Sequence, residues 1–151
     1  DAGIAEIDVY DQQAKYGVHV IQEGDLWKEL PDFTFQASYA SERAISQNRA
    51  AIVRTLAAYA KLYRFLLTPE SKNDFIEAQT AALGRADPAA AEWQWRFFRD
   101  TEVYASDLVL SPERVKYMQD LNFSLEVQKK ILPYENVVDP TVARDAIALL
   151  K

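Results

Sequence analysis

Side chains able to perform acid–base, nucleophilic or metal chemistry are few in this chain of 151 residues. It contains one histidine, His19, and no cysteine, which excludes thiolate metal sites, histidine–cysteine pairs and clusters of histidine ligands. His19 lies between Val18 and Val20 in a predicted strand, so it points to the face opposite its neighbours. A structural or surface role is therefore favoured for His19 over a catalytic one.

Carboxylates are numerous but scattered. Asp8 and Asp11 lie close enough in sequence for paired acid–base work, although a strand end followed by a helix cap is the favoured interpretation. The chain has only four glycines, Gly3, Gly17, Gly24 and Gly84, which are too dispersed to form a phosphate-binding loop. We therefore predict no catalytic residue, no metal site and no cofactor.

The most conspicuous cluster is aromatic. Trp93 and Phe97 are four residues apart, and Trp95 and Phe98 are three apart, so on one helix they form two aromatic faces. Such a helix is most often wedged between neighbours, so core packing is favoured over stacking on a ligand.

The first forty residues read as strand-rich and residues 41–151 as helical. Strands are expected at 7–10, 18–21 and 34–39, with a short helix or turn at 11–16 that Gly17 ends. Apolar residues with helical spacing predict a helix over 45–67. Its buried face is expected to consist of Ile52, Leu56, Tyr59, Ala60, Tyr63 and Leu67. Residues 124–130 are expected to be looser.

Four further helices are predicted from a shared signal at their starts. In each, a capping side chain precedes a proline at the first helical position, where the missing N–H costs nothing. The pairs are Thr68-Pro69, Asp87-Pro88, Ser111-Pro112 and Asp139-Pro140, and the predicted helices are 69–83, 88–100, 112–122 and 140–150.

Composition and charge narrow the partners. Hydrophobic residues make up 49% of the chain, enough for a packed core, and we expect residues 1–151 to form a single domain of the α/β class, dominated by helices. The net charge of −6 disfavours nucleic acid and anionic lipid as partners. Because the predicted first strand starts almost at once, we expect further sequence upstream, including a signal peptide.

Several phrases, in order along the chain, resemble a known family. They are Ile7-Asp8-Val9-Tyr10-Asp11-Gln12-Gln13, Lys15-Tyr16-Gly17 with the strand after it, Leu30-Pro31-Asp32 running to Ala40, Asn48-Arg49 with the long helix behind it, Leu110-Ser111-Pro112-Glu113, Leu132-Pro133-Tyr134-Glu135 and Val138-Asp139. Together they resemble the C-terminal part of the NMT1/THI5-like periplasmic substrate-binding proteins of ABC importers, the group of nitrate, sulfonate and taurine binders.

The resemblance implies the C-terminal portion of a type II periplasmic-binding-protein fold, an incomplete lobe with a few short strands and about five or six helices. It implies a protein that captures a small polar solute (a sulfonate, nitrate, taurine or a pyrimidine-like molecule) and delivers it to an ABC permease. The location implied is periplasmic or lipid-anchored outside the cytoplasm. Ligands of open α/β sheets bind beyond the carboxyl ends of strands, which places the candidate ligand-binding residues at Tyr10, Asp11, Gln12, Ser38 and Tyr39.

Two alternatives stay open. The first is a stand-alone helical interaction or sensor domain that dimerises through exposed strand edges. The second is a THI5-like enzyme of pyrimidine synthesis, which uses histidine and cysteine chemistry and is disfavoured by the single histidine. The resemblance does not name the ligand.

Overall fold

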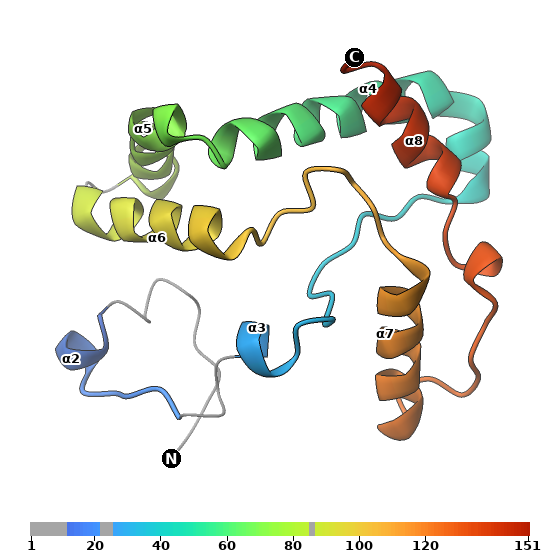
Figure 1. The fold of residues 1–151 in the computed structure, drawn as a ribbon, viewed down its shortest axis with the longest axis horizontal. Helices are drawn as coiled ribbons and strands as arrows, with labels where there is room; N and C mark the ends of the chain where they lie inside the picture. The colour runs from blue at the N-terminus through green and yellow to red at the C-terminus, as the bar shows by residue number, and fades with distance from the viewer. Residues whose placement is uncertain (1–11, 22–25, 85–86) are drawn as a thin grey trace. The chain divides into compact units, whose positions relative to one another are not determined.

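A computed structural model describes residues 12–21, 26–84 and 87–151 of the chain (Figure 1). Their elements are α2 (Gln13–Tyr16), α3 (Leu26–Glu29), α4 (Glu42–Leu66), the 3₁₀ helix η2 (Pro69–Ser71), α5 (Lys72–Leu83), α6 (Pro88–Thr101), α7 (Pro112–Ser124), the 3₁₀ helix η3 (Tyr134–Asn136) and α8 (Pro140–Ala148).

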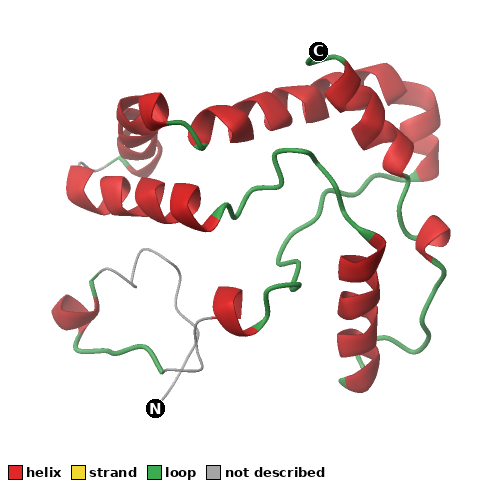
Figure 2. Ribbon diagram, in the orientation of Figure 1, coloured by secondary structure: helices red, strands yellow, loops and turns green. Residues whose placement is uncertain are grey.

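The predicted α/β fold is wrong for the described residues, which contain helices and loops but no strand (Figure 2). The predicted strands 18–21 and 34–39 are irregular chain, and strand 7–10 lies outside the described residues. A strand is held by hydrogen bonds to a neighbouring strand, and no neighbour is formed here for either segment. The predicted strand edges for a homodimer are therefore not found in this part of the chain.

The helix starts, in contrast, follow the capping signals. The Asp87 side chain accepts a hydrogen bond from Ala90 N, Ser111 from Arg114 N, and Asp139 from Thr141 N. Thr68 is the exception, because its hydroxyl donates to Phe65 O instead and the chain makes a 3₁₀ turn before α5 begins at Lys72. Gly17 ends α2 in the left-handed conformation, as predicted.

The chain divides into two compact units. Unit 1 takes in residues 1–25 and 62–105, and unit 2 takes in residues 26–61 and 106–151.

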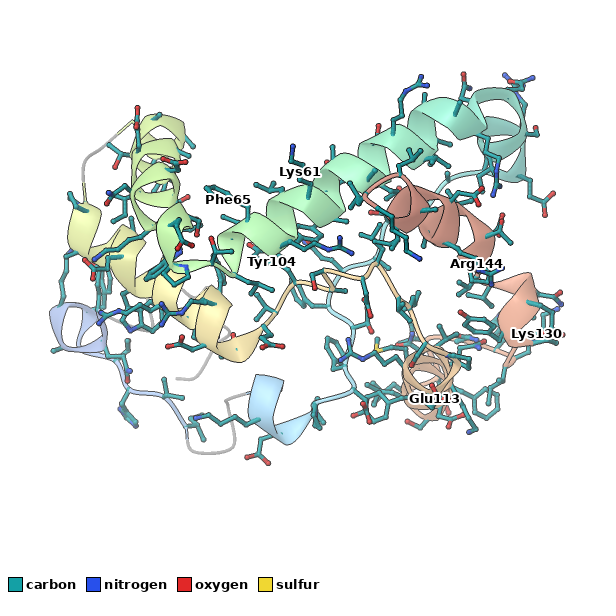
Figure 3. The ribbon with its side chains drawn as sticks, turned by 45° about the horizontal axis from the view of Figure 1, so that its top comes forward. Lys61, Phe65, Tyr104, Glu113, Lys130 and Arg144 are labelled. Atoms are coloured by element: carbon teal, nitrogen blue, oxygen red, sulfur yellow. The ribbon has the colours of Figure 1, made fainter. Side chains whose placement is uncertain are left out.

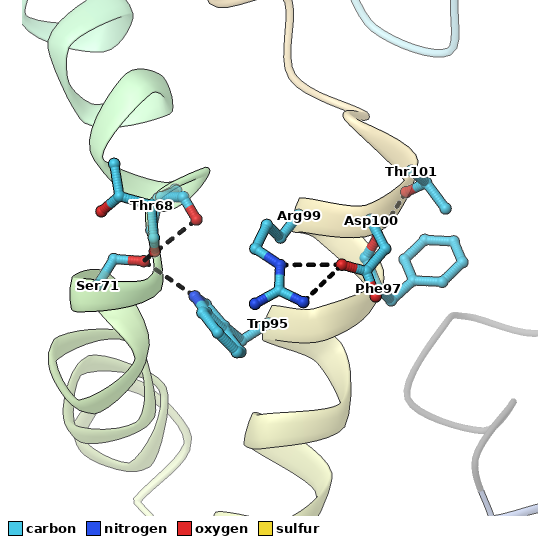
Figure 4. Close-up of polar contacts among 8 residues, drawn as sticks. Thr68, Ser71, Trp95, Phe97, Arg99, Asp100 and Thr101 are labelled. Atoms are coloured by element: carbon cyan, nitrogen blue, oxygen red, sulfur yellow. Dashed lines mark hydrogen bonds and ion pairs between the residues drawn. The ribbon is translucent and has the colours of Figure 1, made fainter.

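In unit 1, helices α5 and α6 pack side by side (Figure 1). The contact between them is held by Trp95, which is buried, and by Ser71, which is completely buried. The Trp95 indole Nε1 donates to Ser71 Oγ at 2.9 Å, and Ser71 Oγ donates in turn to the carbonyl oxygens of Leu66 and Thr68 (Figure 4). This arrangement ties the start of α5 to the middle of α6.

The aromatic side chains of unit 1 pack on one another, in agreement with the packing interpretation. The ring of Trp93 stacks on that of Phe97 with centroids 5.6 Å apart, and Tyr63 stacks on Tyr104 at 4.8 Å. Phe98 meets Phe75 edge to face at 5.9 Å. Burial, and then the neighbouring Tyr63 hydroxyl, raises the pKa of Tyr104 (Figure 3).

The core of unit 2 lies between α4 and α8. Val53 and Ala57 of α4 pack against Val142 and Ala146 of α8. The predicted buried face of the long helix is confirmed in part. Ala60 is completely buried, and Ile52, Leu56, Tyr63 and Leu67 are half-buried. Tyr59 is exposed, so its predicted burial is wrong. Arg49 connects the same two helices, with its Nη2 atom 2.6 Å from Asp145 Oδ2 and 2.9 Å from Thr141 Oγ1. The helix is kinked just before this residue, at Asn48, whose backbone is not helical.

A second structured feature of unit 2 is the loop after α7. Gln119 is 8% exposed, and its Oε1 accepts from Leu132 N at 2.8 Å and from Gln128 Nε2 at 2.8 Å. Its Nε2 donates to Leu132 O at 3.0 Å. One buried amide thus fixes residues 125–132 against the helix, where a looser piece was predicted.

Candidate functional site

A shallow depression in unit 1 lies between α5 and α6. Its cavity volume is about 20 Å³, room for about one water molecule, and it is open to solvent. Its lining residues are Gln12 from the turn before α2, Gln79, Thr80 and Leu83 from α5, and Asp87, Ala90, Ala91 and Gln94 from the start of α6.

Helical spacing explains why these residues meet. The α6 residues follow one another at i, i+3, i+4 and i+7 from the capping Asp87, so they form a single stripe along the helix. The two alanines on this stripe fill little of the space between the helices. Farther along α6 the large Trp95 closes the contact, so the depression lies beside the first turns of the helix.

Gln94 is the central polar group of the depression. It is 7% exposed, and its Oε1 accepts a hydrogen bond of 2.8 Å from Gln79 Nε2. Among the described residues its own Nε2 donates to no protein atom, although this atom is not sealed from solvent. A buried amide with unused N–H donors next to an open depression is a place where a solute acceptor can bind.

Two further side chains offer hydrogen bonds. The Thr80 hydroxyl, half-buried, has no protein partner in the described ranges. Asp87 uses Oδ1 to cap α6 through Ala90 N at 3.1 Å, and its other carboxylate oxygen accepts from no described group. Because Asp87 also neutralises the positive end of α6, the helix start does not attract an anion here.

Two described lysines make polar contacts close in sequence to the lining residues. Lys15 Nζ donates to Gln12 Oε1 at 2.8 Å, and Lys72 Nζ lies 2.7 Å from Glu92 Oε1. The hydrogen bond from Lys72 lowers the pKa of the Glu92 carboxyl and, together with the charges of Lys72 and Arg96, outweighs the opposing effect of burial. Among the described lining residues, Asp87 is the one charged side chain.

The structure does not bring the predicted ligand-binding residues together in one site. Gln12 lines the depression in unit 1, whereas Ser38 and Tyr39 lie in an exposed stretch of unit 2, where Tyr39 is 99% exposed. Tyr10 and Asp11 lie outside the described residues, as does Asp8. His19 is exposed and lies in irregular chain rather than in a strand.

The sequence interpretation missed Gln79, Thr80 and Gln94. The signal available was the stripe of small residues that leads from the capping Asp87 to Gln94, on the same helix as the aromatic cluster. The sequence prediction for this helix relied on its aromatic residues, because aromatic side chains are usually buried. A glutamine in a helix usually faces water, so Gln94 was not selected.

The described residues contain neither a candidate metal-binding cluster nor a candidate membrane-spanning helix. No group of three or more His, Asp or Glu side chains in them could hold a metal ion, and none of their helices combines the length and the apolar character of a membrane span. No protein-family model, curated protein or solved structure matches this chain. The site must therefore be interpreted from its own residues and from the resemblance of the sequence phrases.

Proposed function

We propose that this chain is a solute-binding protein that captures a small polar molecule in the depression between α5 and α6. The observation that carries the proposal is Gln94, a buried amide whose Nε2 faces no protein acceptor in the described residues. The Gln94 N–H groups reach solvent, so a solute carbonyl can take the place of water as their acceptor. This binding needs no sheet, because its side chains come from helices and a turn.

The remaining lining suits recognition of a polar solute. The Thr80 hydroxyl can donate or accept a hydrogen bond, and the Asp87 carboxylate can accept one. Leu83 and the two alanines supply apolar contact. A few directed polar groups among apolar ones are typical of small-molecule sites. The predicted ligand-binding residue Gln12 belongs to the same lining.

The assignment to an importer comes from the resemblance to NMT1/THI5-like proteins. On this proposal the solute is handed to an ABC permease, and the protein works in the periplasm or on a lipid anchor outside the cytoplasm.

The test is a binding screen by calorimetry with nitrate, taurine, alkanesulfonates, pyrimidines and small amides. Each active solute is then titrated into Gln94→Leu, with Gln47→Leu on the exposed surface of α4 as the matched control. The proposal expects at least one solute to bind, and expects Gln94→Leu to weaken binding about tenfold or more while Gln47→Leu leaves it unchanged. Failure of every solute to bind would contradict the proposal.

The alternative of a helical interaction domain has one observation in its favour. The loop held by Gln119 carries Leu125 and Val127, whose side chains are 62% and 74% exposed. Exposed apolar side chains on an ordered loop are a feature of protein-binding surfaces. Sedimentation equilibrium tests it: self-association that Val127→Asp abolishes would favour this alternative, and a monomer at all concentrations would count against dimerisation.

A further inference from the structure

The single methionine of the chain, Met118, lies on α7 in unit 2 and is partly buried. Its Sδ atom accepts a hydrogen bond of 3.3 Å from the backbone N–H of Thr34, which lies 84 residues earlier in the sequence. This contact ties the irregular segment that contains Thr34 to α7. It does so through a weak acceptor, because a thioether sulfur attracts hydrogen-bond donors less than an oxygen does.

The side chain of Thr34 supplies a second donor in the same place. Its Oγ1 atom is sealed from solvent and has no hydrogen-bond partner among the described residues. Three covalent bonds separate Oγ1 from the backbone N of the same residue, so the hydroxyl lies within about 4 Å of the N atom that meets the sulfur. A buried hydroxyl without a partner is costly, and few are retained in folded proteins.

We propose that Met118 is a site of oxidation by a peroxide, and that the oxygen of the resulting sulfoxide is held by the N–H and the hydroxyl of Thr34. In this reaction a lone pair of Sδ forms a bond to one peroxide oxygen, and the O–O bond breaks. The departing hydroxide takes the proton of the transferred oxygen and leaves as water. The sulfur thereby loses two electrons, and the peroxide gains them.

Two features distinguish this site from a methionine that oxidation only damages. A sulfoxide is polar, so in an apolar core its oxygen would be left without a donor. Here the sulfur already meets the Thr34 N–H, and the nearby hydroxyl has no other partner in the described ranges. Met118 is also not completely buried, so a molecule as small as hydrogen peroxide can reach it. Both residues belong to unit 2, so the site is separate from the depression of unit 1.

The first measurement treats the folded, ¹⁵N-labelled chain with hydrogen peroxide. Peptide mass mapping is expected to find one added oxygen at Met118, under conditions that fully oxidise a free methionine peptide. Hydrogen exchange of the Thr34 amide, followed by NMR, is expected to slow by about threefold or more, because its N–H then donates to an oxygen instead of a sulfur.

Thr34→Val gives the sharper test, because valine keeps the shape of the side chain and removes the hydroxyl. In the reduced chain this hydroxyl has no partner in the described part of the structure, so its loss should leave the melting temperature unchanged or raise it. In the oxidised chain the same change removes a donor to the sulfoxide. Oxidation should therefore lower the melting temperature of Thr34→Val by about 4 °C or more relative to its effect on the wild type. Thr55→Val on the exposed surface of α4 is the matched control and should respond to oxidation as the wild type does.

Three results would overturn the inference. The first is a Met118 that stays reduced in peroxide that oxidises the free peptide. The second is an oxidised wild type that unfolds, or whose Thr34 amide exchanges as fast as in the reduced chain or faster. The third is an equal effect of oxidation on the melting temperatures of the wild type and Thr34→Val. Met118→Leu cannot form a sulfoxide, so its Thr34 amide should not respond to peroxide, and a response like that of the wild type would also contradict the inference.

Discussion

The Trp95–Ser71 hydrogen bond in unit 1 gives the most quantitative prediction for stability. Ser71→Ala removes the acceptor of the Trp95 N–H, 2.9 Å away, in a place where Ser71 is fully buried and Trp95 is 5% exposed. Ser71 makes no side-chain cap to α5, so the loss is that of the buried hydrogen bonds and not of a helix cap. An indole N–H left unpaired in such a place costs about 1–3 kcal/mol.

We therefore expect Ser71→Ala to lower the free energy of unfolding by about 2 kcal/mol, and the melting temperature by about 4–8 °C. Urea unfolding followed by tryptophan fluorescence measures the change, since Trp93 and Trp95 both lie on α6. Ser46→Ala is the control: Ser46 Oγ donates to Arg43 O on the exposed surface of α4, and its loss should change stability by less than about 0.5 kcal/mol.

A double-mutant cycle with Trp95→Phe isolates the hydrogen bond, because phenylalanine keeps most of the apolar contact and removes the N–H. In the Trp95→Phe background, Ser71→Ala should cost about 1 kcal/mol less than it does in the wild type. Equal costs in the two backgrounds would refute the reasoning, since they would mean that this hydrogen bond contributes nothing to stability.

Three further predictions concern the loop after α7, an acidic cap and a buried tyrosine. Gln119→Ala should cost about 2–3 kcal/mol and speed tryptic cleavage at Lys129 and Lys130, because it removes the amide that holds residues 125–132; unchanged cleavage would contradict this. Hydrogen bonds from the Thr141 hydroxyl and N–H, and then the charge of Arg49, lower the pKa of Asp139. The ionised Asp139 therefore stabilises the fold above its unfolded pKa of about 3.9, and this contribution is lost as the pH falls through the folded pKa. Asp139→Asn should therefore flatten the acid side of a melting-temperature profile, and a profile parallel to that of the wild type would count against it. Burial raises the pKa of Tyr104, so its stabilising effect is complete below about pH 10 and is lost as the pH rises through the folded pKa. In an ultraviolet titration, Tyr104→Phe should remove a tyrosine that ionises above about pH 10. Loss of one that ionises at about pH 10 would be the contrary result.

The helix starts could be predicted because their causes are local. A capping side chain and the proline beside it act within one turn, and Asp87, Ser111 and Asp139 all cap as predicted. Thr68 shows the limit of this signal, since its hydroxyl found the carbonyl of Phe65 three residues earlier and left the cap unmade.

Strands 18–21 and 34–39 were predicted wrongly because a strand is not a local structure. Short apolar runs such as Val18–Ile21 suit a strand, but their backbone groups need a neighbour that the pattern does not specify. In the described structure Val20 N instead donates to the side chain of Gln13, seven residues earlier. The burial of α4 depends on distant sequence in the same way: contact with α8 selected Val53 and Ala57 over the half-buried Ile52.

The site was only partly accessible from the sequence. Gln12 was expected beyond the end of strand 7–10, which lies outside the described residues. The structure places Gln12 in the turn before α2, where it lines the depression, and its role in ligand binding stays a prediction. Gln79 and Gln94 are fifteen residues apart, and their pairing requires the α5–α6 contact that Trp95 and Ser71 maintain. Such a tertiary contact has no signature in the spacing of either glutamine.

The side-chain amide of Gln94 offers the most direct test of the claim that this chain binds a solute. Its NH₂ resonances can be assigned by comparison with Gln94→Leu and followed by NMR during titration with the best solute of the calorimetric screen. A downfield shift that saturates with the same dissociation constant as calorimetry is predicted, because Nε2 gains an acceptor in the bound state. Resonances that stay unchanged while the solute binds would contradict the account and place the binding site elsewhere.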